Sequence, residues 1–260
     1  MKWLAVSLLL AGILLLGNSQ SAVYECYNCT DCNTAIAGAA AGDTILLAQN
    51  ITNVSGDCIN ISYKDNLAFD CNSYPITGMG NGAGINLSFS NHSILLNCIM
   101  QNFSYGIWVG YSVNSSVINI TTKLNWNEGV SVRESDYSWI DTIHSEDPFG
   151  NTGGNYSYFF NISVQNVSRS WGSVSFANMN SSLVKNVSVY DGILGINMEE
   201  SAKNILSGLA LINNDYGIRF EYYSKNNTVN DSLIEGNECG AYLSDIWNTN
   251  SDNNFFYNNI

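Results

Sequence analysis

Positive charge and proline are both scarce in this chain of 260 residues, which has nine lysines and arginines and only two prolines. Against 22 aspartates and glutamates these give a formal net charge of −13, so a phosphate backbone would be repelled and we expect no nucleic-acid partner. No stretch after residue 22 holds a sustained 3.6-residue apolar period, apart from the length of a turn around 35–41. This absence argues against helical bundles and coiled coils.

Apolar and small polar residues are abundant instead. Hydrophobic residues make up 45% of the chain, which also has 22 glycines and 15 tyrosines, and asparagine and serine are frequent. A chain of this length and apolar content can bury one sizeable core, so the composition excludes intrinsic disorder. It is typical of a β-rich, exported protein.

The N-terminal residues have the pattern of a secretory signal peptide. Lys2 precedes an apolar run over 4–16, and small and polar residues suited to cleavage follow near Ser21 or Ala22. An uncleaved membrane anchor is the alternative, but about 13 apolar residues fall short of the roughly 20 that span a bilayer. We therefore expect a signal peptide over 1–22 and a mature protein that is secreted or held at the cell surface.

Seven cysteines in an exported chain indicate disulfides, and their odd number leaves at least one thiol unpaired or paired with another molecule. Cys26, Cys29 and Cys32 directly follow the leader, where they would staple an irregular N-terminal cap over 23–41. A metal or redox site is the alternative for this motif. It would need a fourth ligand, and the chain offers only His92 and His144.

Internal repetition is the strongest signal in the sequence. Glycine recurs at intervals of 21 to 23 residues and usually opens a Gly-apolar-x-apolar tetrad, at Gly84, Gly106, Gly129, Gly150, Gly172, Gly195, Gly217 and Gly240. A second set of repeating positions lies nine residues before seven of these glycines. It consists of Asn97, Ile120, Asp141, Ser163, Asn186, Gly208 and Asp231. Each period therefore holds two or three short strands separated by Asn/Ser/Gly turns.

A repeat of about 22 residues that contains only short strands cannot bury its apolar face alone, so successive repeats must stack into a solenoid of parallel sheets. This predicts an all-β fold, a parallel β-helix over 42–260. The segments GDTILL, CINI and LAFDCNSYPITG, together with the glycine tetrads, resemble the right-handed parallel β-helix proteins of the pectin-lyase-like and NosD-like superfamily, in particular its exported members. A leucine-rich repeat is the competing fold, but its L-x-x-L-x-L frame is not seen.

Stacking predicts columns of residues about 4.8 Å apart on neighbouring coils. In each tetrad the apolar residues, such as Ile107 and Val109, should point inward, and the second and fourth residues after the glycine should point outward. The first outward column contains Asn86, Trp108, Ser131, Val174, Asn197, Arg219 and Tyr242. The second contains Ser88, Gly110, Arg133, Phe176, Glu199, Glu221 and Ser244.

These columns place Glu199 and Glu221 on adjacent coils beside Arg219, with Trp108 and Tyr242 exposed on the same face. Paired carboxylates can transfer protons in polysaccharide cleavage, so Glu199, Glu221 and Arg219 are the candidate catalytic residues. Aromatic faces stack on sugar rings, which makes Trp108, Arg219 and Tyr242 the candidate ligand-binding residues. The alternative is an ordinary cross-strand ion pair that relieves repulsion between the two glutamates.

The resemblance to β-helix enzymes implies catalytic motifs that this chain lacks. Calcium-dependent pectate lyases use an arginine or lysine base beside a carboxylate calcium site, and polygalacturonase-like hydrolases carry Asp-Asp, Gly-His-Gly and Arg-x-Lys motifs. None of these is present: arginine occurs only at Arg133, Arg169 and Arg219, and neither histidine has a glycine neighbour. The fold itself does not specify a reaction.

An acidic segment over 133–154 is a second candidate site. Asp141, Glu146 and Asp147 are the candidate metal ligands, for calcium if any cofactor is used, and His144 is a candidate general base. The ordering lacks the Asp-x-Asp-x-Asp-Gly pattern of a calcium loop, and a solvated acidic loop is the alternative.

Sixteen N-x-S/T triplets in an exported chain invite two interpretations, glycan attachment and turn formation. We expect asparagine to form turns and stacked ladders at most of them and to carry glycans at a minority. Among the remaining cysteines, Cys58 is a possible partner for Cys71, which lies in register with Cys98. The alternative is that these stacked cysteines stay reduced as small core residues, and Cys239 has no partner in register. We expect Cys239 to be the unpaired thiol.

We conclude from the sequence that the chain is an exported β-helix, a structural or carbohydrate-binding module whose partner is a polysaccharide or a cell-envelope component. The alternative is a polysaccharide lyase or glycoside hydrolase. Because the last residues, NNFFYNNI, would end the solenoid in an open sheet edge, end-to-end association is a further expectation.

Overall fold

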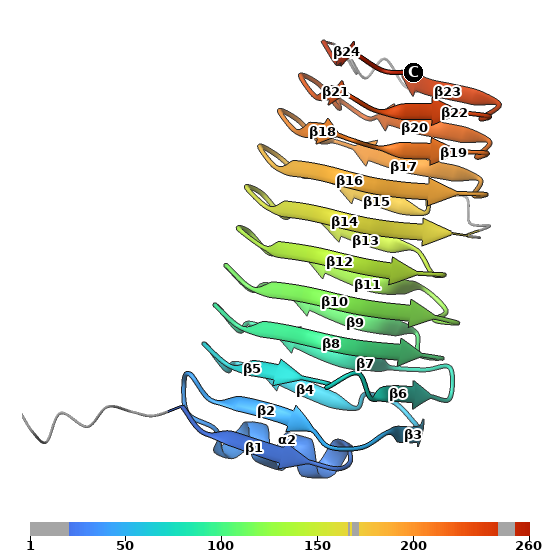
Figure 1. The fold of residues 1–260 in the computed structure, drawn as a ribbon. Helices are drawn as coiled ribbons and strands as arrows, with labels where there is room; N and C mark the ends of the chain where they lie inside the picture. The colour runs from blue at the N-terminus through green and yellow to red at the C-terminus, as the bar shows by residue number, and fades with distance from the viewer. Residues whose placement is uncertain (1–20, 166, 168–171, 244–252) are drawn as a thin grey trace, which may run out of the picture.

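The computed structural model describes residues 21–165, 167, 172–243 and 253–260, and the chain forms a parallel β-solenoid (Figure 1). Two parallel sheets run along its length, one of 15 strands and one of nine. The first, sheet A, contains β1 (Val23–Cys26), β2 (Thr44–Leu47), β3 (Ile51–Val54), β5 (Ala68–Asp70), β6 (Pro75–Gly78), β8 (Ile94–Gln101), β10 (Ser116–Lys123), β12 (Trp139–Ser145), β14 (Tyr158–Gln165), β16 (Leu183–Tyr190), β18 (Ile205–Ser207), β19 (Ala210–Ile212), β21 (Thr228–Asn230), β22 (Leu233–Glu235) and β24 (Phe255–Tyr257).

The second, sheet B, contains β4 (Ile59–Ser62), β7 (Ala83–Ser88), β9 (Tyr105–Gly110), β11 (Glu128–Arg133), β13 (Phe149–Thr152), β15 (Val174–Ala177), β17 (Leu194–Glu199), β20 (Tyr216–Glu221) and β23 (Cys239–Leu243). Each coil from β2 to β23 contributes strands to both sheets, and every pairing is between successive coils (Figure 1). The prediction of an all-β parallel β-helix is confirmed.

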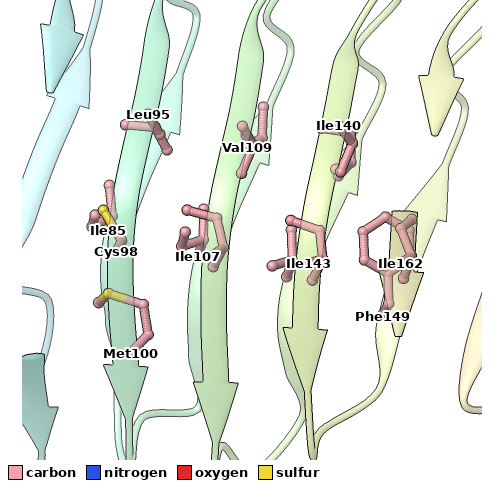
Figure 2. Packing of buried hydrophobic residues seen from close by; sticks show 14 of the residues in the cluster. Ile85, Leu95, Cys98, Met100, Ile107, Val109, Ile140, Ile143, Phe149 and Ile162 are labelled. Carbon is pink, nitrogen blue, oxygen red and sulfur yellow. The ribbon is translucent and has the colours of Figure 1, made fainter. Parts of the chain in front are cut away.

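The core lies between the two sheets and consists of aliphatic and aromatic columns. Ile107 and Val109 of sheet B are fully buried, as the tetrad pattern predicts, and Ile143 and Ile162 occupy neighbouring positions of one sheet A column (Figure 2). Burying each such side chain contributes roughly 1.5–3 kcal/mol. A single coil has no second layer to cover these residues, so the stacking of coils creates the core.

Asparagine forms many of the corners. The long strands of sheet A each contain one residue with positive φ, and this residue is Asn97, Asn119, Asn161 or Asn186 in β8, β10, β14 and β16. Asparagine tolerates this left-handed conformation better than most residues. The amides also stack: Asn119 Nδ2 donates to Asn97 Oδ1 at 2.7 Å, and Asn186 Nδ2 donates to Asn161 Oδ1 at 3.2 Å.

In the middle of the chain, the strand register in both sheets differs from the register that the repeat spacing predicts. The sheet A corner column contains Asn119, Thr142 and Asn161, where the spacing predicted Ile120, Asp141 and Ser163. In sheet B, Gly150 pairs with Ser131 and Ser175, so it belongs to the first outward column.

The glycine column of sheet B is consequently interrupted. Pro148 and Ser173 stand next to Phe149 and Val174, at the places where Gly150 and Gly172 were expected. The outward residues of β15 are Ser175 and Ala177, and the predicted Val174 and Phe176 are fully buried. The coil from Ser131 to Gly150 is three residues shorter than the average of 22, and the next coil, from Gly150 to Ser175, is three residues longer. The two differences cancel, so the mean period does not reveal the shift in register.

The N-terminal cap contains a helix, α2 (Cys29–Gly38), where no more than a turn around 35–41 was expected. Asn28 caps it by accepting a hydrogen bond from the backbone of Asp31 at 2.9 Å. Its ten residues are too few to display a 3.6-residue period clearly, which is why the pattern missed it. Strand β1 pairs in parallel with β2, so sheet A starts at Val23.

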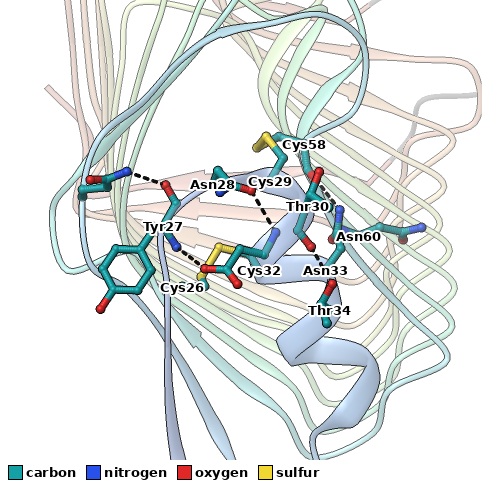
Figure 3. The surroundings of a disulfide bond; sticks show 12 residues. Cys26, Tyr27, Asn28, Cys29, Thr30, Cys32, Asn33, Thr34, Cys58 and Asn60 are labelled. Atoms are coloured by element: carbon teal, nitrogen blue, oxygen red, sulfur yellow. Dashed lines mark hydrogen bonds between the residues drawn. A yellow bond between two sulfur atoms is a disulfide. The ribbon is translucent and has the colours of Figure 1, made fainter.

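Three disulfides fasten this end of the solenoid. Cys26 pairs with Cys32, and Cys29 pairs with Cys58, which ties α2 to β1 and to the start of sheet B (Figure 3). The third pair is Cys71–Cys98, so the suggested Cys58–Cys71 pair does not form. Cys239 is free, as its lack of a partner in register predicted.

Three disulfides indicate an extracellular protein, because such bonds persist in oxidising compartments. Among the described residues, no helix has the length and apolar character needed to cross a membrane. The predicted signal peptide lies almost entirely in residues 1–20, outside the described residues.

Candidate functional site

The outer face of sheet B is hollowed where its outward side chains are smallest. Strands β13 and β15 present Gly150, Thr152, Ser175 and Ala177 there, and these residues line a hollow of about 330 Å³. Bulkier residues border it, namely Tyr105, Asn127, Glu128, Arg133 and Glu199.

Arg133 and Glu128 form one wall of the hollow. Arg133 Nη2 donates to both Glu128 oxygens, at 3.0 and 3.1 Å. Its Nε donates to Ser131 Oγ at 3.0 Å, and its Nη1 donates to Thr152 Oγ1 at 3.1 Å. The guanidinium also lies over the Trp108 ring, 5.5 Å from the centroid, in a cation–π contact. Each nitrogen of the guanidinium therefore already has a partner within the protein.

The floor of the hollow is shaped to admit Glu128. A Cβ on Gly150 would overlap the Glu128 carboxylate, so only glycine leaves room for that carboxylate to reach Arg133. Gly153, three residues later in the chain, likewise leaves room for a carboxylate, because a Cβ there would overlap that of Glu134.

A second hollow of about 390 Å³ adjoins the first. It is lined by Asp57, Gly82, Ala83, Asn86, Ser104 and Trp108, and it shares Tyr105 and Asn127 with its neighbour. The Tyr105 and Trp108 rings meet edge to face with centroids 5.0 Å apart. The two hollows lie side by side on sheet B, and we call them together the sheet B groove. It runs from Asn86 on β7 to Glu199 on β17, about 24 Å at the usual spacing of strands.

Glu199 and Glu221 stand at the far end of the groove, on β17 and β20, as directly paired residues. Arg219 Nη2 lies 3.0 Å from Glu221 Oε2, and Arg219 Nε donates to Asn197 Oδ1 at 3.2 Å. Glu221 is 7% exposed, whereas Glu199 is partly exposed and lines the hollow.

The pKa of Glu199 is raised above its ordinary value of 4.5. Partial burial is the main cause, and the negative charges of Glu221 and Glu200 add to it, while Arg219 opposes the shift. Carboxylic acids that hold their proton in a groove are candidates for proton donation. The structure thus brings together the three predicted catalytic candidates, Glu199, Glu221 and Arg219.

The predicted ligand-binding residues are not gathered at one place. Tyr242 is 40% exposed and pairs with Arg219 in register, but Trp108 lies five coils away from Arg219, at the other end of the groove. Trp108 is half-buried by Tyr105 and Arg133 rather than openly exposed.

The acidic segment does not converge on a common point. Asp141 accepts a hydrogen bond from Asn161 Nδ2 at 2.8 Å on sheet A, and Glu146 is exposed. Asp147 is 4% exposed and binds the backbone and side-chain nitrogens of Asn125, at 2.9 and 2.7 Å. Among the described residues no group of three or more His, Cys, Asp or Glu side chains is arranged to hold a metal ion.

Asp147 has a structural role at a corner of the solenoid. Burial raises its pKa, and the hydrogen bonds from Asn125 oppose that shift. His144 is exposed and borders a small hollow of about 100 Å³ on sheet A together with Glu146 and Ser163.

Sequence reasoning missed Glu128 and Tyr105, which border the groove. Both directly precede a glycine of the repeat, as does Tyr216, and this position also faces outward. Strict alternation from the two outward columns would turn this position inward, and the chain instead buries the glycine and the residue after it in succession, so the pattern could not reveal this third column.

No protein-family model matches the sequence, and no curated protein matches it. The solved structure of an alginate lyase from Paenibacillus sp. str. FPU-7 is similar in fold, with a TM-score of 0.54 at 12% identity over 92% of this chain and 97% of that one. The catalytic domain of a GH87 α-1,3-glucanase, in complex with nigerose, gives a TM-score of 0.47 at 10% identity over 84% of this chain and 54% of that one.

The A-module of an Azotobacter vinelandii mannuronan C-5 epimerase gives a TM-score of 0.43 at 12% identity, over 84% of this chain and 80% of that one. This chain spans about half the length of the glucanase domain and nearly all of the alginate lyase. At these identities the likeness to the alginate lyase is one of fold, which is the parallel β-helix.

Proposed function

We propose that this chain is an extracellular, pectin-lyase-like β-helix protein that binds a polysaccharide in the sheet B groove. The observation that carries the proposal is the groove itself, two adjoining hollows that together extend over about 24 Å, with the Tyr105 and Trp108 rings toward one end and Glu199 at the other. Its open, elongated form suits a chain molecule better than a compact ligand. The alginate lyase, similar in fold over nearly its whole length, acts on a polysaccharide by its name and supports the same class of ligand.

The lining of the groove has the chemistry that sugars require. Tyr105 and Trp108 offer partly exposed rings for the apolar faces of sugar units, and the amides of Asn86 and Asn127 offer donors and acceptors for hydroxyl groups. The small residues Ser175 and Ala177 leave space for the chain to pass over β15.

Co-sedimentation with insoluble polysaccharides, and affinity electrophoresis with soluble ones, test this proposal. Trp108→Ala and Tyr105→Ala should each weaken retention by about tenfold, because removing a buried stacking contact costs about 1–2 kcal/mol. Tyr27→Ala is the matched control, since Tyr27 is 46% exposed on the cap, away from the groove. Equal retention of all three variants and the parent would contradict binding in the groove.

Cleavage of the bound polysaccharide is a second candidate function, favoured by the raised pKa of Glu199. A protonated Glu199 would donate its proton to the glycosidic oxygen, and the ion-paired Glu221 on the next strand would supply the second carboxylate of a hydrolytic pair. Arg219 would hold Glu221 in place. The predicted polysaccharide-lyase alternative would use the same residues.

Measurement of new chain ends separates binding from cleavage. Incubation with each polysaccharide that is retained should release reducing ends, or unsaturated ends for a lyase, and Glu199→Gln and Glu221→Gln should each abolish the release. Retention without new ends from the parent chain would leave binding as the whole function.

A further inference from the structure

The charges of the sheet B groove are unfavourable for an acidic polysaccharide. The described residues that line its two hollows include three carboxylates, Asp57, Glu128 and Glu199, and one cation, Arg133. A polyuronate carries one carboxylate on each sugar, and a groove that binds it must supply cations whose hydrogen-bond donors are free.

Both arginines near the groove are already neutralised by a carboxylate of the protein. Arg133 is held by both oxygens of Glu128, by Ser131 and by Thr152, and its face is covered by Trp108. Arg219 is paired with Glu221. A uronate carboxylate that approaches Arg133 would meet the like charge of Glu128, whose two oxygens both accept from Nη2.

Glu128 is the residue that closes Arg133 to other anions. Its side chain is only 13% exposed, and it lies in the space left by the missing side chain of Gly150. The pair is therefore built into the floor and wall of the groove and is not a mobile surface contact.

We propose, on the basis of the function proposed above, that the groove is selective for uncharged polysaccharides and that Glu128 is the residue that determines this selectivity. With Glu128 in place the groove recognises hydroxyl groups through Asn86 and Asn127 and repels uronates. Without the negative charge of Glu128, Arg133 carries an unneutralised positive charge at the centre of the groove and becomes a uronate site.

Affinity electrophoresis tests this selectivity with two sets of probes. The uncharged probes are α-1,3-, β-1,3- and β-1,4-linked glucans, and the acidic probes are alginate and polygalacturonate. The parent chain should be retained by at least one uncharged glucan and not by the acidic polymers. Glu128→Gln should gain about tenfold in affinity for the acidic polymers, since a hydrogen bond to a charged group is worth about that factor.

Glu235→Gln is the matched control, because it removes the same charge from β22 on sheet A. It should leave the preference of the parent chain unchanged. Thermal unfolding of Glu128→Gln verifies that it folds. Salt dependence of the parent chain is a second measurement, because repulsion of a polyuronate should weaken as sodium chloride is added.

The outcomes separate the selectivity from the proposed function. Retention of the parent chain by alginate or polygalacturonate, weakened by salt, would overturn the selectivity and leave polysaccharide binding intact. A folded Glu128→Gln variant with no gain toward the acidic polymers would overturn the role of Glu128. Failure of the parent chain to bind any polymer of either set would overturn the proposed function itself.

Discussion

Glu128 and Gly150 occupy neighbouring strands of sheet B, and the carboxylate of Glu128 fills the space that a side chain on residue 150 would take. This contact joins a regular position of the repeat, on β11, to β13, the first strand whose register is shifted. It explains why the smallest residue stands at the centre of the groove, and it makes the shape of the groove testable by single substitutions.

Gly150→Ala should push the Glu128 carboxylate away from Arg133 and narrow the hollow. We expect polysaccharide retention to fall severalfold, with a loss of stability of about 1 kcal/mol or less, because the ion pair is partly solvated. Gly38→Ala is the control, since a Cβ there meets nothing within 4 Å. Affinity electrophoresis and urea unfolding measure the two effects, and unchanged retention would argue against a role for the hollow.

Glu199→Gln should change how stability depends on pH. Because the pKa of Glu199 is raised in the folded protein, the folded state binds its proton more tightly than the unfolded state does. This stabilisation is present below the ordinary value of 4.5 and is lost as the pH rises through the raised value. The variant should therefore gain stability over the parent at pH 7 and not at pH 4 in urea unfolding. A gain of the same size at both pH values would count against this origin.

Asp147→Asn should fold at least as stably as the parent at neutral pH. Burial destabilises the charged form of Asp147. An asparagine accepts the equivalent pair of hydrogen bonds elsewhere along the solenoid, where Asn227 Oδ1 accepts from the backbone and side-chain nitrogens of Asn204 at 3.0 and 2.9 Å. Asp147→Ala should instead cost about 1–3 kcal/mol, because it leaves the Asn125 nitrogens unpaired. Thermal and urea unfolding compare the two variants, and equal damage from both would refute the interpretation.

Asn151→Val should stabilise the protein. Asn151 is 1% exposed between Val132 and Phe176, and neither atom of its amide has a hydrogen-bond partner among the described residues. Replacing an unpaired buried amide by an apolar side chain of similar size is worth about 1–3 kcal/mol. Asn204→Val, which breaks a satisfied ladder, should destabilise by a similar amount. A lower unfolding midpoint for Asn151→Val would mean that its amide has a function.

Replacement of both Cys71 and Cys98 by alanine should cost about 2–4 kcal/mol, since their disulfide closes a loop between two coils. Cys239→Ala should have little effect, because this thiol is free. Urea unfolding without reductant measures both changes. Equal stability of the double variant and the parent would show that the coils are held together without this bond.

The sequence predicted the candidate carboxylates better than it predicted the groove. Glu199, Glu221 and Arg219 could be placed together because they lie within two intact repeats, where alternation and period agree. Glu128 could not be connected with Gly150, because their contact crosses the coil that is shorter than the rest. The sequence could not predict the disulfide partner of Cys29 either, because Cys29 reaches Cys58 only through the position of α2 beneath the first coil.

By itself the sequence determined the solenoid, the inward columns such as Ile107 and Val109, and the free thiol of Cys239. It could do so because a short repeat has only one way to bury its apolar face, which is to stack in register on its neighbours. The tertiary structure alone decided the lateral register of β13 and β15, and with it the groove and the Arg133–Glu128 pair. One corner loop can be shorter and the following corner loop longer without any change in the mean repeat length. The strand register, and hence which side chains are neighbours, is therefore seen only in the hydrogen bonding between the strands.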